Sequence, residues 1–145
     1  MQFNPITSVD YLVVHCAATP PTLDIGAAEI DQWHRKEGWL KIGYHYVIRR
    51  NGQIEKGRAD TEIGAHCLGY NRNSLGICMV GGVDAKNRAE NNFTPEQFNT
   101  LRELLGKLFV EYPSAQLRGH RELNPGRDCP SFDVRDWYSN TGEPE

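Results

Sequence analysis

Residues 11–16 read Tyr-Leu-Val-Val-His-Cys, and this short run points to the fold more directly than any other stretch of the chain. A brief, unbroken apolar run predicts a strand that is buried on both faces, as in a sheet covered by helices. The run ends in His15 and Cys16, so side chains that bind metals stand where the strand leaves the sheet.

Two segments follow that predict a helix and a hairpin. Residues 27–37 carry apolar side chains at helical spacing, after a start at Asp24 or Gly26 and before a stop at Gly38. Residues 44–57, YHYVIRRNGQIEKG, contain two β-rich runs. The pair Asn51-Gly52 between them predicts the favoured two-residue hairpin turn.

The second half of the chain alternates between strand and helix patterns. Residues 58–73 show no sustained period and predict a surface loop of the kind that lines binding sites. Residues 74–80 predict a strand, residues 94–112 a long helix capped by Thr-Pro-Glu-Gln, residues 116–120 a short strand, and the stretch from Asp133 a last helix. This order predicts an α/β fold with a central mixed sheet flanked by helices and a site in a cleft at the strand ends.

Length and composition restrict the class of protein. A chain of 145 residues predicts one domain over 1–145, with residues from about 139 as a mobile tail. A net charge of −3 argues against a nucleic-acid partner, and no apolar run approaches the ~20 residues of a membrane helix. The first residues lack a basic, apolar signal peptide, so we expect cytoplasmic synthesis and action only after release or lysis. We expect a monomer.

The four cysteines do not predict a disulfide framework. They lie in a chain without a leader, and none belongs to a Cys-x-x-Cys pair, which also argues against a zinc ribbon. Cys78, in an apolar run, predicts a small buried thiol. Cys16 should point to the opposite face of its strand from His15, into the core, and Cys67 is expected to be a non-catalytic loop thiol.

Two histidines and a cysteine form a candidate ligand set. His15 and His120 close predicted strands, and Cys129 lies nine positions after His120, beyond a Pro-Gly turn. Three protein ligands with an open fourth position are what a catalytic zinc requires. The spacing matches no standard zinc finger, so core packing of Cys129 remains possible, as does Asp128 as a substitute oxygen ligand.

Several long motifs, in order, resemble one enzyme family. The motifs are VVHCAAT (13–19), EIDQWHRKEGWLKIGYHYVIRRNGQIEKGR (29–58), IGAHCLGYNRNSLGICMVGG (63–82), NFTPEQ (92–97) and PGRDCPSFD (125–133). Together they resemble the type 2 N-acetylmuramoyl-L-alanine amidases, in particular the small phage-lysozyme amidases, which are related to animal peptidoglycan recognition proteins. The resemblance covers nearly the whole chain.

The resemblance implies an activity and a cofactor. It implies hydrolysis of the amide that joins N-acetylmuramic acid to L-alanine in peptidoglycan, by a phage or prophage endolysin. It places Zn²⁺ on His15, His120 and Cys129, and it implies peptidoglycan or a muropeptide as the partner.

The resemblance also implies roles for three other residues. It places the active-site tyrosine at Tyr44 and a substrate-binding histidine of the cleft at His66. Arg127 stands where the family often has a lysine, and the separation of His120 from Cys129 differs by a residue from that in some relatives. Because arginine stays protonated, we expect Arg127 to contact an oxyanion or a substrate carboxylate and not to act as a general acid.

Simpler roles remain open for these positions. Tyr44 could be a strand aromatic beside Tyr46, and His66 a loop residue without chemistry. His45 is expected to be buried and structural, and His34 solvated or half-packed.

Two rival functions use the same features. A non-catalytic peptidoglycan-binding module is the first, but such relatives typically lack the cysteine ligand, and this chain has Cys129 together with Tyr44. A zinc peptidase acting within the stem peptide is the second, but the chain has no His-Glu-x-x-His helix. The amidase is the prediction.

Overall fold

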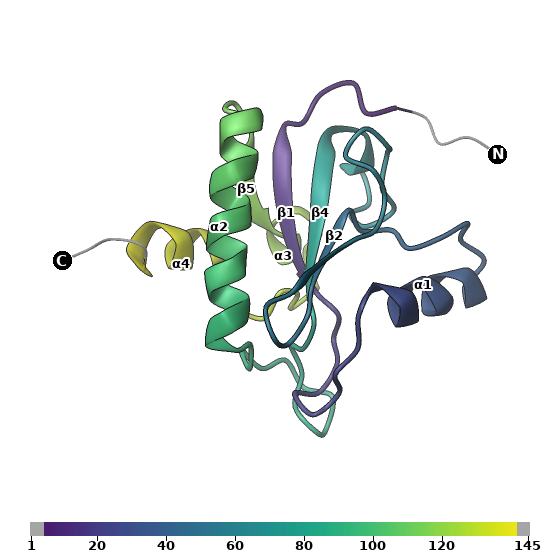
Figure 1. Ribbon diagram of the computed structural model, residues 1–145, viewed down its shortest axis with the longest axis vertical. Helices are drawn as coiled ribbons and strands as arrows, with labels where there is room; N and C mark the ends of the chain where they lie inside the picture. The colour runs from purple at the N-terminus through teal and green to yellow at the C-terminus, as the bar shows by residue number, and fades with distance from the viewer. Residues whose placement is uncertain (1–4, 142–145) are drawn as a thin grey trace.

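A mixed sheet forms the centre of the molecule, as the element order predicted. The computed structural model describes residues 5–141, and within them the chain forms a five-stranded sheet in the order β3-β2-β4-β1-β5 (Figure 1). Strands β1, β2, β4 and β5 pair in parallel, whereas β3 pairs antiparallel with β2 at the edge. The strands are β1 (Tyr11–Cys16), β2 (Tyr46–Ile48), β3 (Ile54–Lys56), β4 (Ser74–Met79) and β5 (Gln116–Gly119).

Strand β1 lies between β4 and β5 and is buried on both faces, which confirms the prediction from its apolar run. Successive side chains of a strand point to opposite faces. Cys16 accordingly belongs to the large core cluster, with Leu12 and Val14, while the buried His15 faces the other way. Strand β1 thus places the imidazole of His15 on one face of the sheet, while Leu12, Val14 and Cys16 pack on the other face.

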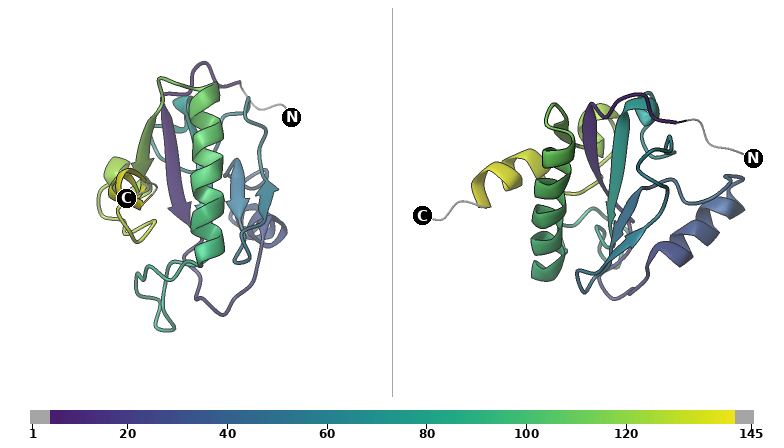
Figure 2. Two further views of the ribbon diagram at one scale, coloured as in Figure 1. Left: turned by 60° about the vertical axis from the view of Figure 1, so that its left-hand side comes forward. Right: turned by 45° about the horizontal axis from the view of Figure 1, so that its top comes forward.

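Helices cover the two faces of the sheet (Figures 1 and 2). Helix α2 (Pro95–Glu111) packs its leucines into the large cluster, and α4 (Val134–Thr141) lies beside β5. Helix α1 (Ala27–Lys36) lies on the opposite side, where Ile30 joins a smaller cluster. Two short elements, η1 (Asn71–Asn73) and α3 (His120–Leu123), precede β4 and follow β5.

The start of α2 confirms the predicted capping box. The Gln97 backbone N–H donates to Thr94 Oγ1 over 3.1 Å, and the Thr94 backbone N–H donates to Gln97 Oε1 over 3.0 Å. Each side chain therefore satisfies a donor that the helix leaves unpaired.

The turn of the hairpin differs from the prediction. Ile48 pairs with Ile54, and the Arg49 N–H donates to the Gln53 carbonyl over 2.9 Å, so residues 50–52 form a three-residue loop. Gly52 adopts φ +89°, the left-handed conformation that such loops require at their last position. The predicted two-residue Asn51-Gly52 turn was therefore wrong.

The last strand and the C-terminal segment also differ in their bounds. Strand β5 ends at Gly119, so His120 begins α3 and does not close the strand. Helix α4 continues to Thr141, and residues 142–145 of the predicted tail lie outside the described residues.

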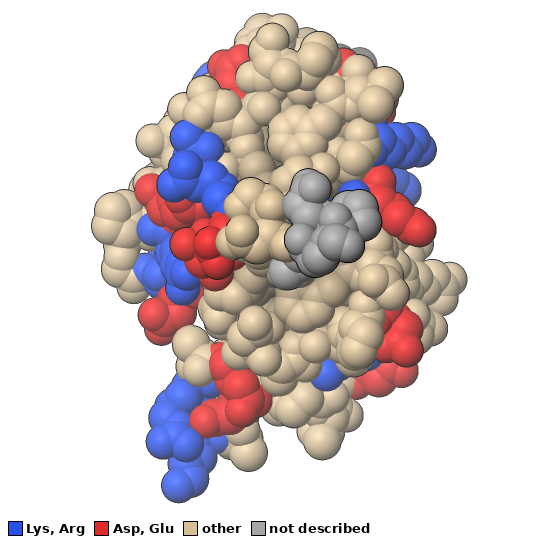
Figure 3. Space-filling model, turned by 90° about the vertical axis from the view of Figure 1, so that its left-hand side faces the viewer, with Lys and Arg blue, Asp and Glu red and all other residues tan. Residues whose placement is uncertain are grey.

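Membrane-spanning helices and surface charge can both be assessed on the described part of the chain. No helix within residues 5–141 has the length and apolar content needed to cross a membrane. On the face that Figure 3 presents, basic and acidic side chains are interspersed. That face therefore carries no extended field of one sign.

Candidate active site

The predicted ligand set comes together in space. One nitrogen from each of His15 and His120 and the sulfur of Cys129 lie within 4.8 Å of one another. They come from the end of β1, the first residue of α3 and the loop that follows α3. Within residues 5–141 no carboxylate joins this group, and Asp128 is exposed, so the structure gives no support to Asp128 as a substitute ligand.

The hydrogen bonds of the two imidazoles indicate which nitrogen of each is available to a metal. His15 Nε2 lies 2.9 Å from His66 Nδ1, and His120 Nε2 lies 2.8 Å from Asn124 Oδ1. Each Nε2 is thus occupied by a protein partner, which leaves Nδ1 for a metal. Burial lowers the pKa of His15 well below 6.5 and also lowers that of His120, so both rings are neutral, the form that binds metals.

Cys129 is held by the end of β1. Its sulfur accepts the backbone N–H of Cys16 over 2.9 Å, and it is half-buried. The hydrogen bond with the Cys16 thiol and burial raise the pKa of Cys129 well above 9.0. Without a cation the sulfur therefore keeps its proton, and a metal would have to displace it.

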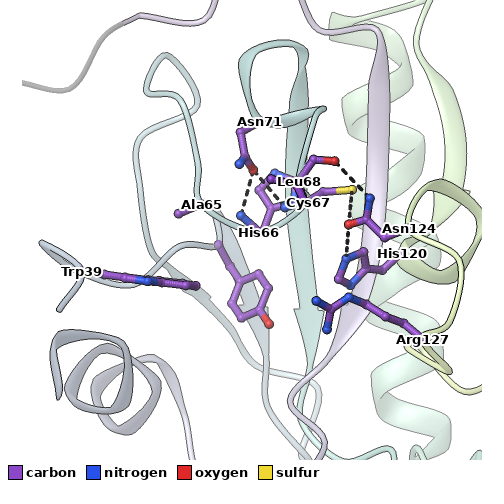
Figure 4. Close-up of a pocket in the computed structure, with 10 residues that line it drawn as sticks. Trp39, Ala65, His66, Cys67, Leu68, Asn71, His120, Asn124 and Arg127 are labelled. Carbon is purple, nitrogen blue, oxygen red and sulfur yellow. Dashed lines mark hydrogen bonds between the residues drawn. The ribbon is translucent and has the colours of Figure 1, made fainter. Parts of the chain in front are cut away.

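A pocket of about 420 Å³ opens beside this group (Figure 4). All three residues predicted to act beside the ligands line it: Tyr44, His66 and Arg127. Trp39 and Leu68 are its exposed apolar members, with 40% and 83% of their surface accessible. The full lining is Trp39, Tyr44, Ala65, His66, Cys67, Leu68, Asn71, His120, Asn124 and Arg127.

A second pocket, of about 290 Å³, is lined in part by the candidate cysteine ligand. Cys16, Cys129 and Arg127 are among the residues that line it. Arg127 therefore borders both pockets, and His120 and Cys129 each line one of them.

Tyr44 does not take the simpler role of a strand aromatic. It precedes β2, and its ring joins the cluster on the α1 side, whereas Tyr46 and Ile48 pack on the α2 side. Its ring centroid lies 5.0 Å from that of His15. Burial raises the pKa of Tyr44 well above 10.0, so the phenol stays protonated and can donate a hydrogen bond.

The remaining histidines have distinct roles. His45 is fully buried; its Nδ1 accepts the Gly76 N–H and its Nε2 donates to the Glu62 carbonyl, which confirms a structural role. His34 is half-buried and accepts the Gly43 N–H over 3.0 Å, as expected of a half-packed side chain. His66 contacts a candidate ligand directly, with its Nδ1 2.9 Å from His15 Nε2.

Asn124 is the site residue that the sequence did not reveal. The sequence pointed only to a turn-shaping role, yet Asn124 accepts from His120 and donates to the Leu68 carbonyl over 3.0 Å. Its position four residues after His120 was the available signal, because side chains four apart meet on a helix face.

Comparison with known proteins decides the family. The sequence pattern described as N-acetylmuramoyl-L-alanine amidase matches residues 5–132. The chain belongs to this family. The endolysin of Escherichia phage T7 is 47% identical over 138 residues, which are 95% of this chain and 91% of that protein.

Solved structures agree with this assignment. The amidase resembles the endolysin LysCS, an N-acetylmuramoyl-L-alanine amidase from Clostridium intestinale, with a TM-score of 0.83 and 25% identity over 97% of this chain and 88% of that one. It also resembles peptidoglycan recognition protein-LE in complex with tracheal cytotoxin, with a TM-score of 0.78 and 25% identity over 94% of this chain and 84% of that one. The predicted α/β fold, family and hydrolysis of an amide bond are confirmed.

Proposed function

We propose that this amidase is a zinc-dependent endolysin that cleaves the bond between N-acetylmuramic acid and L-alanine in peptidoglycan. The observation that carries the proposal is the convergence of His15, His120 and Cys129 within 4.8 Å beside a pocket. The phage endolysins at 45–47% identity support the biological role: synthesis in the cytoplasm and action on the wall after release.

The donor set suits zinc. Two neutral imidazole nitrogens and one thiolate are ligands that Zn²⁺ takes in proteins, and three ligands leave a fourth position open. One thiolate leaves a formal charge of +1 at the centre. When bound, zinc supplies Lewis acidity that polarises a carbonyl and lowers the pKa of water to about 7.

Tyr44 would stabilise the negative charge that develops on the amide carbonyl. Its phenol lines the pocket, and its ring packs close to His15. Since the hydroxyl keeps its proton, it can donate a hydrogen bond to an oxyanion.

Arg127 would contact an oxyanion or a carboxylate of the substrate. It borders both pockets and forms no ion pair with any other residue between 5 and 141. A guanidinium remains charged at any working pH, so this side chain can hold an anion but cannot deliver a proton to the leaving amine.

The side chains that line the pocket suit the chemical groups of a muropeptide. The exposed ring of Trp39 offers a flat apolar surface, and the amides of Asn71 and Asn124 and the guanidinium of Arg127 also line the pocket. The structural relative in complex with tracheal cytotoxin, a monomeric diaminopimelic acid-type peptidoglycan, supports a ligand of this class. We propose that the amidase binds it as a monomer, without a nucleic-acid or membrane partner.

Digestion of purified peptidoglycan tests the proposal. We expect new L-alanine amino termini, loss of this activity with a chelator and its return with Zn²⁺. A binding module would sediment with the wall and release nothing. A stem-peptide peptidase would expose a different amino terminus, which mass analysis of the products would identify.

A further inference from the structure

One loop is linked by hydrogen bonds to the outer side of both candidate histidine ligands, directly to His15 and through Asn124 to His120. Residues 65–71, here called the pocket loop, supply Ala65, His66, Cys67, Leu68 and Asn71 to the wall of the main pocket (Figure 4). His66 reaches His15 from this loop, and the Leu68 carbonyl reaches His120 through Asn124.

The contact with His15 belongs to a chain of three hydrogen bonds. His15 Nε2 lies 2.9 Å from His66 Nδ1, His66 Nε2 lies 3.2 Å from Ser74 Oγ, and Ser74 Oγ donates to the Tyr70 carbonyl over 2.6 Å. If a metal occupies His15 Nδ1, the protons on the two histidine rings can each be assigned to one nitrogen. His15 Nε2–H donates to His66 Nδ1, and His66 Nε2–H donates to the serine oxygen.

The ring of His66 is confined as well as hydrogen-bonded. A Cβ at Gly76 of β4 would lie 2.6 Å from its Cγ, and a Cβ at Gly64 would lie 2.6 Å from its Cδ2. Only 7% of the residue is exposed, and both nitrogens have protein partners. His66 can therefore offer a substrate only a carbon edge, so its hydrogen-bonding capacity serves His15.

His120 is also joined to the pocket loop by a chain of hydrogen bonds. His120 Nε2–H donates to Asn124 Oδ1 over 2.8 Å, and Asn124 Nδ2 donates to the Leu68 carbonyl over 3.0 Å. The loop itself is held by Asn71, whose Oδ1 accepts the backbone N–H groups of His66 and Cys67 over 2.8 and 2.9 Å.

We infer that His66 and Asn124 are positioning residues that fix the tautomer and orientation of the two imidazole ligands. This inference rests on the proposed metal function. Hydrogen bonds from a ligand's outer nitrogen orient the ring, and their loss typically costs roughly 10- to 100-fold in metal affinity.

Zinc affinity, measured by competition with a chromogenic chelator, tests the inference. We expect His66→Phe, which keeps an aromatic ring but cannot accept a hydrogen bond, to weaken binding about 10- to 100-fold. His66→Asn keeps an acceptor near the position of Nδ1 and should restore most of the affinity. Asn124→Ala should weaken binding to a similar extent as His66→Phe.

Leu68→Ala is the matched control. Its side chain is 83% exposed in the same loop, and only its backbone carbonyl enters the hydrogen-bond network. We expect unchanged zinc affinity and, if anything, a higher KM. The Co²⁺-substituted protein gives a second readout, because the cobalt d–d absorption should shift in His66→Phe and not in Leu68→Ala.

The outcomes separate this inference from the proposed function. A wild-type chain that binds no zinc would remove the metal function itself. A wild type that binds zinc, with His66→Phe showing equal affinity and the same cobalt spectrum, would overturn the positioning role. If His66→Phe does not fold, Ser74→Ala decides: it removes the support behind His66, and unchanged affinity there would also overturn the inference.

Discussion

The backbone N–H of Cys16 donates to the sulfur of Cys129 over 2.9 Å, across 113 positions of sequence. The bond joins the end of β1 to the loop after α3. The preceding residue on β1, His15, is itself a candidate ligand. One strand end therefore supplies a candidate metal ligand and also a donor that would stabilise negative charge on a second candidate ligand.

Cys129→Ser should remove the metal. Serine keeps the size of the side chain but replaces the thiolate with a hydroxyl that stays protonated. We expect zinc content to fall well below one ion per chain. Amide hydrolysis should fall more than about 100-fold, which exceeds the loss expected when a residue that only hydrogen-bonds a ligand is replaced. Metal analysis together with the release of L-alanine amino termini would measure both.

Cys16→Ala is the control for that change. The backbone N–H that reaches Cys129 is retained, so we expect zinc content to stay near the wild-type value. Stoichiometric zinc in Cys129→Ser would contradict the assignment of this sulfur as a ligand.

Tyr44→Phe should lower kcat and leave KM nearly unchanged. The ring would still pack against the α1-side cluster, but no hydroxyl would remain to donate to the oxyanion. Loss of one such donor costs about 3–4 kcal/mol, or roughly 10²- to 10³-fold in kcat. Steady-state kinetics on a soluble muropeptide would test this, with equal zinc content as the control. A rise in KM alone would indicate a substrate-packing role.

Arg127→Ala should lower kcat/KM by about 100-fold, whereas Arg127→Lys should keep most of it. The reason is that the proposed role needs a positive charge between the two pockets and no proton transfer. Kinetics of the two variants side by side would measure the difference. Wild-type turnover in Arg127→Ala would exclude the role.

Local patterns in the sequence predicted most of the fold. The run of β1 and the capping box of α2 depend on neighbouring residues, so they could be read directly. The hairpin turn could not, because its conformation depends on distant contacts: Thr100 of α2 donates to the Gly52 carbonyl over 2.6 Å. The predicted end of β5 at His120 was wrong for a local reason: α3 begins there, and the Glu122 side chain accepts the Gly119 N–H.

Some features of the candidate site could likewise be predicted from the sequence, and others could not. The types and order of His15, His120 and Cys129, with the family resemblance, sufficed to predict the candidate ligands that the fold brings together. The partners of their outer nitrogens could not be predicted, because the path of residues 65–71 brings His66 to His15 over 51 positions of sequence. Loop conformation of this kind leaves no periodic signal.

Stability should fall on acidification, with His45 as a measurable contributor. Burial lowers the pKa of His45 to about 4 from an ordinary 6.5. Between these values the unfolded chain binds more protons at this position than the folded one, so the free energy of unfolding decreases as the pH falls. The shift corresponds to at most about 3 kcal/mol.

His45→Gln, which does not titrate, isolates that contribution. Urea unfolding of the metal-free proteins at about pH 7 and about pH 4.5 should show a loss of stability that is smaller in the variant than in the wild type by up to about 3 kcal/mol. The buried His15 and His66 also have lowered pKa values, and His45 contributes to both shifts, so the comparison reports His45 together with its coupling to these two rings. Equal losses in the two proteins would mean that the pKa of His45 is not lowered in the folded chain.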